Sequence, residues 1–226
     1  MLGECREHGG FRAEVCPTCG QKGRFLMNDH ELNRVGRIMA GILRHFPDRF
    51  NLDMDRRGWV DLEQMVHAIR DSKERLHWLR PYHIGAIVAT DPKGRYQIEE
   101  GRVRATYAHS LDLELDDLPL ANADELYYPV TEEELDIVLE TGLKPSDRKK
   151  IHLSGTMDKA YAAGRVRTDK PTVLRIDARG AQESGTVIRR AGKAVYVSDA
   201  IEPRFLSVVE DVENKIDVAA IGGEEE

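Results

Sequence analysis

Residues 102–110, near the middle of the chain, read Arg-Val-Arg-Ala-Thr-Tyr-Ala-His-Ser and open with the alternation of a β-strand. Val103 and Ala105 fall on one face of this strand, and Arg102 and Arg104 fall on the other. Arginine is almost never fully buried unless it is paired, so the charged face has to meet either water or an anion. The fold must therefore leave one side of this strand open, and periodicity alone favours an ordinary solvated strand.

The size and composition of the chain fit a cytoplasmic protein. Its 226 residues, of which 41% are hydrophobic, suffice for one large or two small domains with their own cores. No apolar run is long enough to span a bilayer, and the N-terminus lacks the pattern of a signal peptide. All three cysteines precede residue 20, which excludes a disulfide framework. We expect no membrane association and take a monomer as the default.

Charge is distributed unevenly along the chain. The formal net charge is −7, yet residues 1–110 carry 18 Lys and Arg against 15 Asp and Glu. The segment 111–140 holds eleven acidic residues and no Lys or Arg. The N-terminal half could therefore meet a polyanion although the whole protein is acidic.

Two short pairs of metal-ligand residues lie at the N-terminus. Cys5 and His8 are separated by two residues, and so are Cys16 and Cys19. One Cys/His pair and one Cys/Cys pair suit a closed tetrahedral zinc site, which leaves no position open for catalysis. The spacing predicts a small structural zinc knuckle over residues 1–27. A disordered leader with chance cysteines is the alternative.

A strong helical pattern follows the knuckle. Apolar residues recur at helical spacing from Leu32 to Phe46, after Asn28 or Asp29 as the N-cap, and Pro47 ends the pattern. Several cationic side chains lie away from this apolar stripe or near its edge. Such a helix face is most often solvated.

Two further helices and a hairpin complete the segment 28–110. Asp61 caps a second helical pattern, and a third lies within 76–90 and is interrupted by Pro81. A turn at 91–94 leads to a strand at 96–98, which returns through 102–106. Three helices followed by a β-hairpin is the element order of a winged-helix module, a shape that commonly handles nucleic acid.

The segment 111–226 mixes strands and helices. The predicted strands are 125–130, 151–154, 172–177, 186–188 and 194–197, followed by a closing apolar segment at 201–206. Thr131 and Glu134 form a capping box for a helix that stops at Gly142, and a second helix runs through 160–163. There is no GxGxxG after a strand and no Walker loop. The fold class is therefore α+β, with a mobile tail ending at Glu226.

Four stretches taken in order resemble the RNA 2′-phosphotransferase family, over a match of about residues 30 to 206. They are 42–47 with 55–60 (Ile-Leu-Arg-His, Pro47, then Asp-Arg-Arg-Gly-Trp-Val), 102–110, 141–145 with 151–154 (Thr-Gly-Leu-Lys-Pro, then Ile-His-Leu-Ser), and 163–167 with 171–174 (Ala-Gly-Arg-Val-Arg, then Pro-Thr-Val-Leu). Each motif alone is weak, but four in register are specific.

The resemblance implies a function and an architecture. Members of that family transfer an internal RNA 2′-phosphate to NAD⁺, which gives 2′-hydroxyl RNA, nicotinamide and ADP-ribose 1″,2″-cyclic phosphate. An RNA with a splice-junction phosphate, tRNA above all, is the implied partner, and NAD⁺ is the consumed co-substrate. The implied fold is a winged-helix-like RNA lobe at 28–110 joined to an ADP-ribosyltransferase-like NAD lobe at 111–226.

The resemblance also assigns site residues. The matches to the family's Arg-His-Arg-Arg tetrad are Arg44, His45, Arg104 and Arg167, with Arg165 as the alternative for the last position. We hypothesise that the arginines grip phosphate oxygens and that His45 binds the phosphate or moves a proton. The expected NAD⁺ contacts are His109, Ser110, Tyr128, His152 and Ser154.

The chain departs from the family pattern at three places, one of which is Lys150, where the family often has a histidine or similar residue before Ile-His-Leu-Ser. Tyr128-Pro129-Val130 stands where the family commonly has His-Gly-Thr, and Ala108 replaces the glycine that precedes His-Ser. Two other functions stay open on sequence alone. One is an ADP-ribosyltransferase that modifies a nucleic-acid phosphate or a protein, and the other is a non-catalytic RNA-binding protein.

Overall fold

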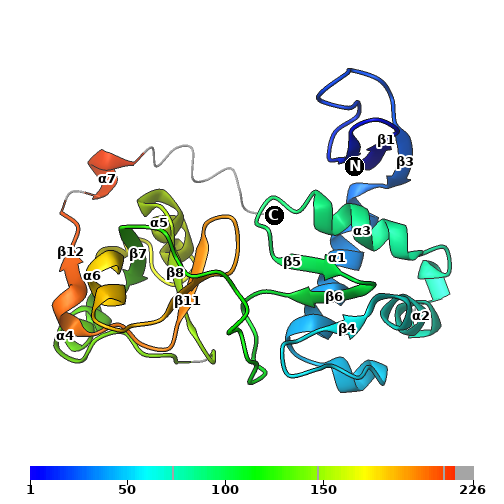
Figure 1. Cartoon of the computed structure of the whole chain (residues 1–226). Coiled ribbons are helices and arrows are strands. Elements are labelled where there is room, and N and C mark those ends of the chain that lie inside the picture. Colours follow the sequence, from blue (N-terminus) through cyan, green and yellow to red (C-terminus); the bar gives the residue numbers. More distant parts are fainter. Residues whose placement is uncertain (73, 147, 211, 217–226) are drawn as a thin grey trace. The chain divides into compact units, whose positions relative to one another are not determined.

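The computed structural model describes all residues except 73, 147, 211 and 217–226, so the predicted mobile tail lies outside the described residues (Figure 1). The chain divides into two compact units, Met1–Asp116 and Asp117–Glu226. The first unit contains both the predicted knuckle at 1–27 and the predicted lobe at 28–110. Helices and strands are mixed in the chain, which confirms the α+β class.

The N-terminal residues form a small antiparallel sheet that the sequence did not predict. Its strands are β1 (Leu2–Cys5), β2 (Gly9–Phe11) and β3 (Arg24–Met27), in the order β2-β1-β3. Phe11 lies against Gly3, where an added Cβ would come within 2.8 Å of the ring. Cys5, Phe11 and Cys16 form a small cluster of their own, while Leu2, Leu26 and Met27 of the same sheet are buried in the main core of the first unit. A cluster of three side chains stabilises the loop between β2 and β3 only weakly, and a bound metal would add to its stability.

Three helices and a second three-stranded sheet form the remainder of the first unit. They are α1 (Asp29–Arg44), β4 (Val60–Asp61), α2 (Leu62–Ser72), α3 (Pro81–Ala89), β5 (Tyr96–Glu99) and β6 (Arg102–Ala105), with short 3-10 helices at Pro47–Phe50 and Glu74–Leu76. The sheet order is β4-β6-β5, and both strand pairs are antiparallel. The apolar faces of the three helices and of the sheet share one core.

The ends of these elements follow from local chemistry. Asn28 caps α1, and its side chain accepts a hydrogen bond from the Glu31 backbone N–H. The Glu31 side chain in turn accepts from the Asn28 backbone N–H. The Asp61 carboxylate accepts from the Gln64 N–H at the start of α2, as predicted. One expectation was wrong. Phe46 was placed on the buried stripe of the first helix, but α1 ends before it and its ring is exposed.

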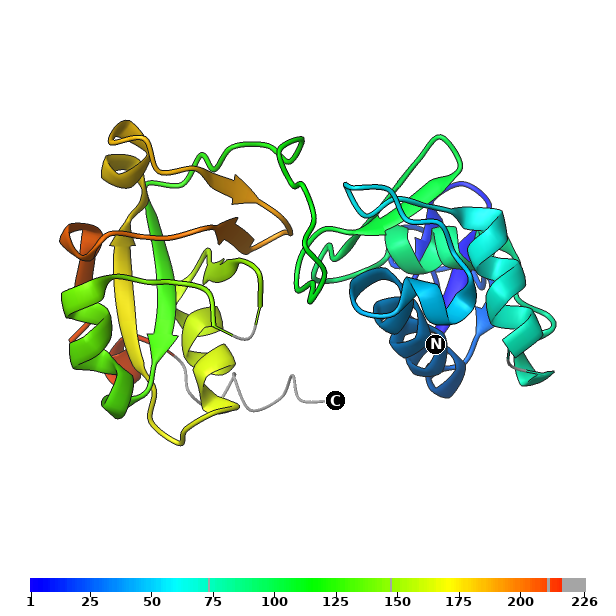
Figure 2. The same ribbon diagram turned by 90° about the horizontal axis from the view of Figure 1, so that it is seen from below.

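A six-stranded antiparallel sheet organises the second unit (Figure 2). Its order is β10 (Ile188–Arg190), β11 (Val195–Ser198), β8 (Ile151–Ser154), β7 (Glu125–Val130), β9 (Thr172–Asp177) and β12 (Leu206–Val208). The helices of this unit are α4 (Glu132–Thr141), α5 (Met157–Arg165), α6 (Ala178–Glu183) and α7 (Val212–Lys215), with a 3-10 helix at Pro203–Phe205.

Helices α5 and α6 cover opposite faces of this sheet. Ala160 and Tyr161 of α5 pack with Val173, whereas Ala178 and Ala181 of α6 pack with Ile176 and its neighbours. Val173 and Ile176 are three apart on β9, so their side chains point to opposite faces. In the part of the chain that the structure describes, no helix is both long and apolar enough to cross a bilayer.

Candidate phosphate-binding residues and metal centre

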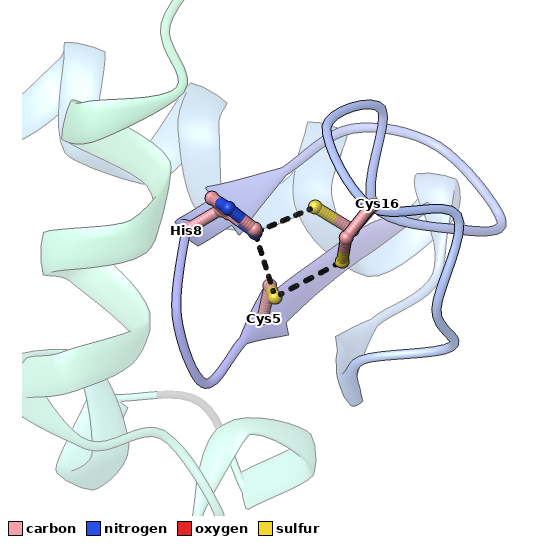
Figure 3. A group of neighbouring side chains, drawn as sticks. Cys5, His8 and Cys16 are labelled. Atoms are coloured by element: carbon pink, nitrogen blue, oxygen red, sulfur yellow. Dashed lines mark hydrogen bonds between the residues drawn. The ribbon is translucent and has the colours of Figure 1, made fainter.

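The four predicted metal ligands come together in the N-terminal sheet (Figure 3). Cys5 ends β1, His8 lies in the turn to β2, and Cys16 and Cys19 lie in the loop before β3. The ligand atoms all lie within 4.8 Å of one another. The Cys5 Sγ lies 3.5 Å from His8 Nδ1 and 3.8 Å from Cys19 Sγ, and the Cys16 Sγ lies 3.7 Å from His8 Nδ1.

The three distances of 3.5, 3.7 and 3.8 Å match edges of a zinc tetrahedron. Metal–sulfur bonds of about 2.3 Å and metal–nitrogen bonds of about 2.0 Å place two sulfurs about 3.8 Å apart, and a sulfur and a nitrogen about 3.5 Å apart. The electrostatics agree with a thiolate ligand at Cys16. Burial alone would raise its pKa, but hydrogen bonds from the backbone of Cys19 and Thr18 and from neighbouring thiols lower the pKa to about 6. The cluster could therefore hold a metal with four protein ligands.

The N-terminal sheet is anchored to helix α3. Arg12 donates from Nε to Thr90 Oγ1 at 3.1 Å and from Nη2 to the Ile87 carbonyl at 3.4 Å. Arg24 donates to the Tyr82 hydroxyl at 2.7 Å, with its guanidinium 4.6 Å from the centroid of that ring. The N-terminal sheet therefore contacts both ends of α3 and is not a disordered leader.

Residues from two of the four motifs, those at 42–47 and 102–110, meet at the end of α1. Arg44 is the last residue of the helix, and its carbonyl accepts a hydrogen bond from the Ser110 N–H at 3.1 Å. His45 follows, with Nδ1 3.0 Å from Ser110 Oγ. The Arg44 guanidinium lies 5.8 Å from the ring centroid of Tyr96 and 5.2 Å from that of Tyr107, at the base of the β5–β6 hairpin. Ser110, which was expected to contact NAD⁺, is therefore a partner of His45 in this structure.

Arg104 differs from the sequence expectation. Its side of β6 was expected to face water or an anion, but only 2% of Arg104 is exposed. Nε donates to Gln97 Oε1 at 2.9 Å, and Nη1 donates to the Arg57 carbonyl at 3.3 Å. The guanidinium lies 4.5 Å from the centroid of the Trp59 ring. Period-two alternation missed this burial because the partners come from a neighbouring strand and from a loop more than 40 residues earlier in the chain.

The loop before β4 contacts both arginines of β6, Arg102 and Arg104. The Asp55 Oδ1 accepts from the N–H groups of Arg57 and Trp59, each at 2.9 Å. The Asp55 Oδ2 accepts from Arg102 Nη1 at 2.9 Å. Arg102 therefore forms an ion pair with Asp55 in this structure. Gly58, with φ of +80°, turns the loop so that Trp59 lies beside Arg104.

Arg167, the remaining predicted arginine, belongs to the second unit. It follows α5, and its backbone N–H bonds to the Gly164 carbonyl at 2.9 Å. Its side chain forms an ion pair with Glu134, the capping-box residue of α4. Burial alone would raise the pKa of Glu134, but the Thr131 N–H and Arg167 lower it. Arg165, the alternative, is exposed.

The predicted NAD⁺ contacts of the second unit do not share one face of the sheet. Ile151 and Leu153 of β8 belong to the core on the α6 side, so the intervening His152 and Ser154 point to the α5 side. Tyr128 packs against the α6-side core. Tyr127 packs with the α5-side cluster and pairs in register with Ser154. A tyrosine therefore does share a face with His152 and Ser154, but it is Tyr127.

Several residues that shape the site carried no sequence prediction of a role. Trp59, Gln97 and Asp55 surround the arginines of β6, and Glu134 contacts Arg167. Asp55 and Trp59 lie within the motif at 55–60. That motif does not indicate that they contact Arg102 and Arg104. Gln97 is the cross-strand neighbour of Arg104, which a hairpin register would have revealed.

Comparison with known proteins places the chain in a family. The model of the RNA 2′-phosphotransferase, Tpt1 / KptA family matches residues 30–200. A "Probable RNA 2′-phosphotransferase 1" of Archaeoglobus fulgidus is 39% identical over 89% of this chain and 92% of its own length. Similar proteins of Methanosarcina barkeri (37% identical, 93% of this chain, 100% of its own) and Thermoplasma acidophilum (39%, 91% and 88%) are also named "Probable RNA 2′-phosphotransferase".

Each match covers most of this chain and most of the similar protein. The match to the Methanosarcina barkeri protein spans 211 residues. Because the match covers 93% of this chain, it includes part of the segment 1–27. The order of the four motifs, the meeting of Arg44 and His45 with Ser110, and these matches lead to one identification: the chain belongs to the RNA 2′-phosphotransferase, Tpt1 / KptA family.

Proposed function

We propose that this protein transfers an internal RNA 2′-phosphate of the splice-junction type, with tRNA as the natural carrier, to NAD⁺. The products are 2′-hydroxyl RNA, nicotinamide and ADP-ribose 1″,2″-cyclic phosphate, and the enzyme works as a cytoplasmic monomer. Family membership supports the removal of an RNA 2′-phosphate. The observation that carries the mechanism is the meeting of Arg44 and His45 with Ser110, because it brings two distant motifs of the family pattern to one place.

The proposed chemistry has two balanced steps. In the first, a 2′-phosphate oxygen bonds to the ribose carbon of NAD⁺ that carries nicotinamide, and nicotinamide leaves, so the RNA becomes ADP-ribosylated. In the second, the adjacent ribose 2″-hydroxyl attacks the phosphorus, and the RNA 2′-oxygen leaves with a proton. The phosphate itself is the nucleophile of the first step, so the protein's task is to orient and stabilise charge.

Arg104 suits that task because its orientation is fixed before substrate binds. The Gln97 side chain, the Arg57 carbonyl and the Trp59 ring, which are neutral groups, hold the guanidinium in this orientation. A preorganised cation stabilises a phosphate without paying to reorganise during the reaction. Arg44, packed over Tyr96 and Tyr107, is proposed as a second phosphate ligand.

Arg167 is proposed as the last member of the group, in preference to Arg165. Both arginines are exposed, but Glu134 and the turn after α5 hold Arg167 in a defined position. The Glu134 carboxylate pairs with the guanidinium as a phosphate would, and we propose that the substrate phosphate replaces it. His109, Tyr128, His152 and Ser154 remain proposed NAD⁺ contacts, and Tyr127 joins them because it shares the face of His152 and Ser154.

The proposed division of labour follows the two units. The element order of the first unit, α1, β4, α2, α3, β5 and β6, supports a winged-helix-like RNA lobe. Its helix α3 carries no Lys or Arg and packs against the N-terminal sheet, so RNA contacts are proposed for the β4-β6-β5 side instead. The second unit is the proposed ADP-ribosyltransferase-like NAD lobe. The proposed zinc of Cys5, His8, Cys16 and Cys19 is structural, because four protein ligands fill its coordination.

Release of nicotinamide tests this function. The protein is incubated with NAD⁺ and either an RNA with one internal 2′-phosphate or the same RNA with a 2′-hydroxyl. We expect nicotinamide to appear in proportion to the 2′-phosphorylated RNA and not with the 2′-hydroxyl RNA. Equal release with both RNAs would reject the 2′-phosphate as the nucleophile.

A further inference from the structure

The Ser110 hydroxyl lies between a histidine nitrogen and a backbone carbonyl. Its Oγ is 3.0 Å from His45 Nδ1 and 3.4 Å from the Arg44 carbonyl oxygen. The Arg44 carbonyl is at the end of α1, where carbonyl groups have no partner within the helix. The N–H of Ser110 donates to the same carbonyl at 3.1 Å. Ser110 thus closes the end of the helix with its main chain and contacts His45 with its side chain.

Both contacts of the Ser110 hydroxyl can be hydrogen bonds at the same time in only one arrangement. A serine hydroxyl has one hydrogen to donate and lone pairs with which to accept. The Arg44 carbonyl can only accept, so the hydroxyl hydrogen points to it. The Ser110 oxygen must then accept from His45, which requires a hydrogen on Nδ1. In a neutral imidazole, a hydrogen on Nδ1 leaves the lone pair on Nε2.

We propose that Ser110 is a positioning residue that holds neutral His45 as the Nδ1–H tautomer, with Nε2 as the basic atom. Its consequence for catalysis rests on the function proposed above. The second step requires a group that accepts the proton of the ribose 2″-hydroxyl and returns it to the RNA 2′-oxygen. A lone pair fixed on Nε2 suits His45 to both transfers. Ser110 acts through His45 in this account, in place of the NAD⁺ contact expected from the sequence.

The backbone that delivers Ser110 is itself unusual. Ala108 has a φ of +66°, which places an alanine in the left-handed region that glycine prefers. His109, between the two, is only 5% exposed. The turn at Ala108 directs the chain back toward the end of α1, and the buried His109 anchors it there. The position of Ser110 is therefore set by the fold and does not depend on a flexible side chain.

The tautomer can be read directly by NMR. The protein is labelled with ¹⁵N histidine, and the Nδ1 and Nε2 resonances of His45 are recorded at a pH where the ring is neutral. His45→Gln assigns the resonances. We expect a protonated Nδ1 and an unprotonated Nε2 in the wild type, which is opposite to the preference of imidazole in water. In Ser110→Ala the ring should move toward the Nε2–H form.

Two further variants separate positioning from mere structure. Ser110→Thr keeps the hydroxyl and should keep the Nδ1–H tautomer, while Ser72→Ala, a serine of α2 in the same unit, should leave His45 unchanged. With 2′-phosphorylated RNA, Ser110→Ala should lower kcat by about 10-fold or more with little change in the KM for NAD⁺, and Thr should restore it.

Two results would overturn the proposal. One is an Nε2–H tautomer in the wild type, which is readable even if Ser110→Ala does not fold. The other is an Nδ1–H tautomer that persists in a folded Ser110→Ala protein. Failure of the proposed function would give a different result. His45 would then show the expected tautomer, but neither the wild type nor any variant would release nicotinamide from NAD⁺.

Discussion

The guanidinium of Arg104 lies over the ring of Trp59, 4.5 Å from its centroid, in a position where only 2% of the arginine is exposed. A buried arginine is costly unless its N–H groups are satisfied. Here a Gln97 side chain and a backbone carbonyl satisfy two of them, and the indole face adds a cation–π contact. The result is an oriented positive charge, which distinguishes this residue from the surface arginine that its strand alternation suggested.

Replacing Arg104 by lysine should separate activity from folding. Lysine keeps a cation but loses the fork that binds Gln97 and a phosphate together. We expect kcat/KM to fall by about 100-fold or more, with a smaller loss of stability than alanine would cause. Initial rates and thermal unfolding measure the two effects. Arg102→Lys is the matched control on the same strand, because Arg102 pairs with Asp55, and should change the rate by less than about 3-fold. Equal rates for Arg104→Lys and wild type would refute the assignment.

The choice between Arg167 and Arg165 can be made with a pair of alanine variants. Arg167→Ala should reduce kcat/KM by about 100-fold or more, and Arg165→Ala by less than about 3-fold, because only Arg167 is held by Glu134. The two residues flank the exposed Val166, so the variants share one local environment. Steady-state rates on 2′-phosphorylated RNA decide. The reverse order of effects would transfer the role to Arg165.

Metal removal should affect stability more than the chemical rate. The apolar cluster at the metal ligands has only three residues, whereas Leu2, Leu26 and Met27 attach the rest of the N-terminal sheet to the main core. Chelation should therefore lower the melting temperature, while single-turnover rates of the protein that is still folded change little. Cys16→Ser should reproduce the loss of stability. Freshly purified, unchelated protein that contains no zinc by elemental analysis would disprove the metal centre.

Asp91 should be a major contributor to the stability of the first unit. Its side chain is fully buried and accepts hydrogen bonds from the backbone N–H, Nε and Nη2 of Arg95, with Oδ1 2.6 Å from Nη2. Burial alone would raise the pKa of Asp91, but Arg95 and Arg12 lower it below its ordinary value of 3.8. A carboxyl group with a lowered pKa stabilises the fold above its unfolded pKa and loses this contribution as the pH falls through the folded value.

Asp91→Asn should therefore destabilise the protein by about 3 kcal/mol at pH 7, since it leaves the partly buried Arg95 without its carboxylate. The difference from wild type should shrink as the pH falls below 3.8. Urea unfolding at pH 7 and at a pH below 3.8 measures this difference in the free energy of unfolding. A difference that does not depend on pH would mean that the charge of Asp91 is not what stabilises the fold.

Ala108→Gly should stabilise the protein. An alanine at a φ of +66° carries strain of about 1 kcal/mol that a glycine does not, and the greater flexibility of glycine in the unfolded chain offsets part of the gain. We expect a net gain of about 0.5 kcal/mol by denaturant unfolding. Ala89→Gly, in α3 where φ is helical, is the matched control and should destabilise by about 1 kcal/mol. A loss of stability in Ala108→Gly would show that this strain is not present in solution.

Local signals were sufficient for much of the fold. The capping box of Thr131 and Glu134 located the start of α4, and the β-rich segments 125–130, 151–154 and 172–177 matched β7, β8 and β9 in their bounds. The strands β1, β2 and β3 escaped prediction because they have only three or four residues each, and the glycines among them obscure alternation. The short helix α6 begins at an Asp177 cap and was likewise too brief to show a period.

The sequence proposed candidate site residues but gave no information about the contacts that they make. Motifs identified Arg44, His45, Arg104 and Arg167 one at a time. The bond between His45 and Ser110 joins positions 65 residues apart, and the ion pair of Arg167 with Glu134 joins positions 33 apart. Local periodicity carries no information about such pairs, since they depend on how separate elements pack.

The fate of the phosphorus atom tests the central proposal most directly. An RNA carrying a ³²P-labelled internal 2′-phosphate is incubated with the protein, with and without NAD⁺, and the products are separated. We predict that the label moves to ADP-ribose 1″,2″-cyclic phosphate, only when NAD⁺ is present, and that the RNA is left with a 2′-hydroxyl. Label that stays on a stable ADP-ribosylated RNA, on unchanged RNA, or in inorganic phosphate would contradict the account.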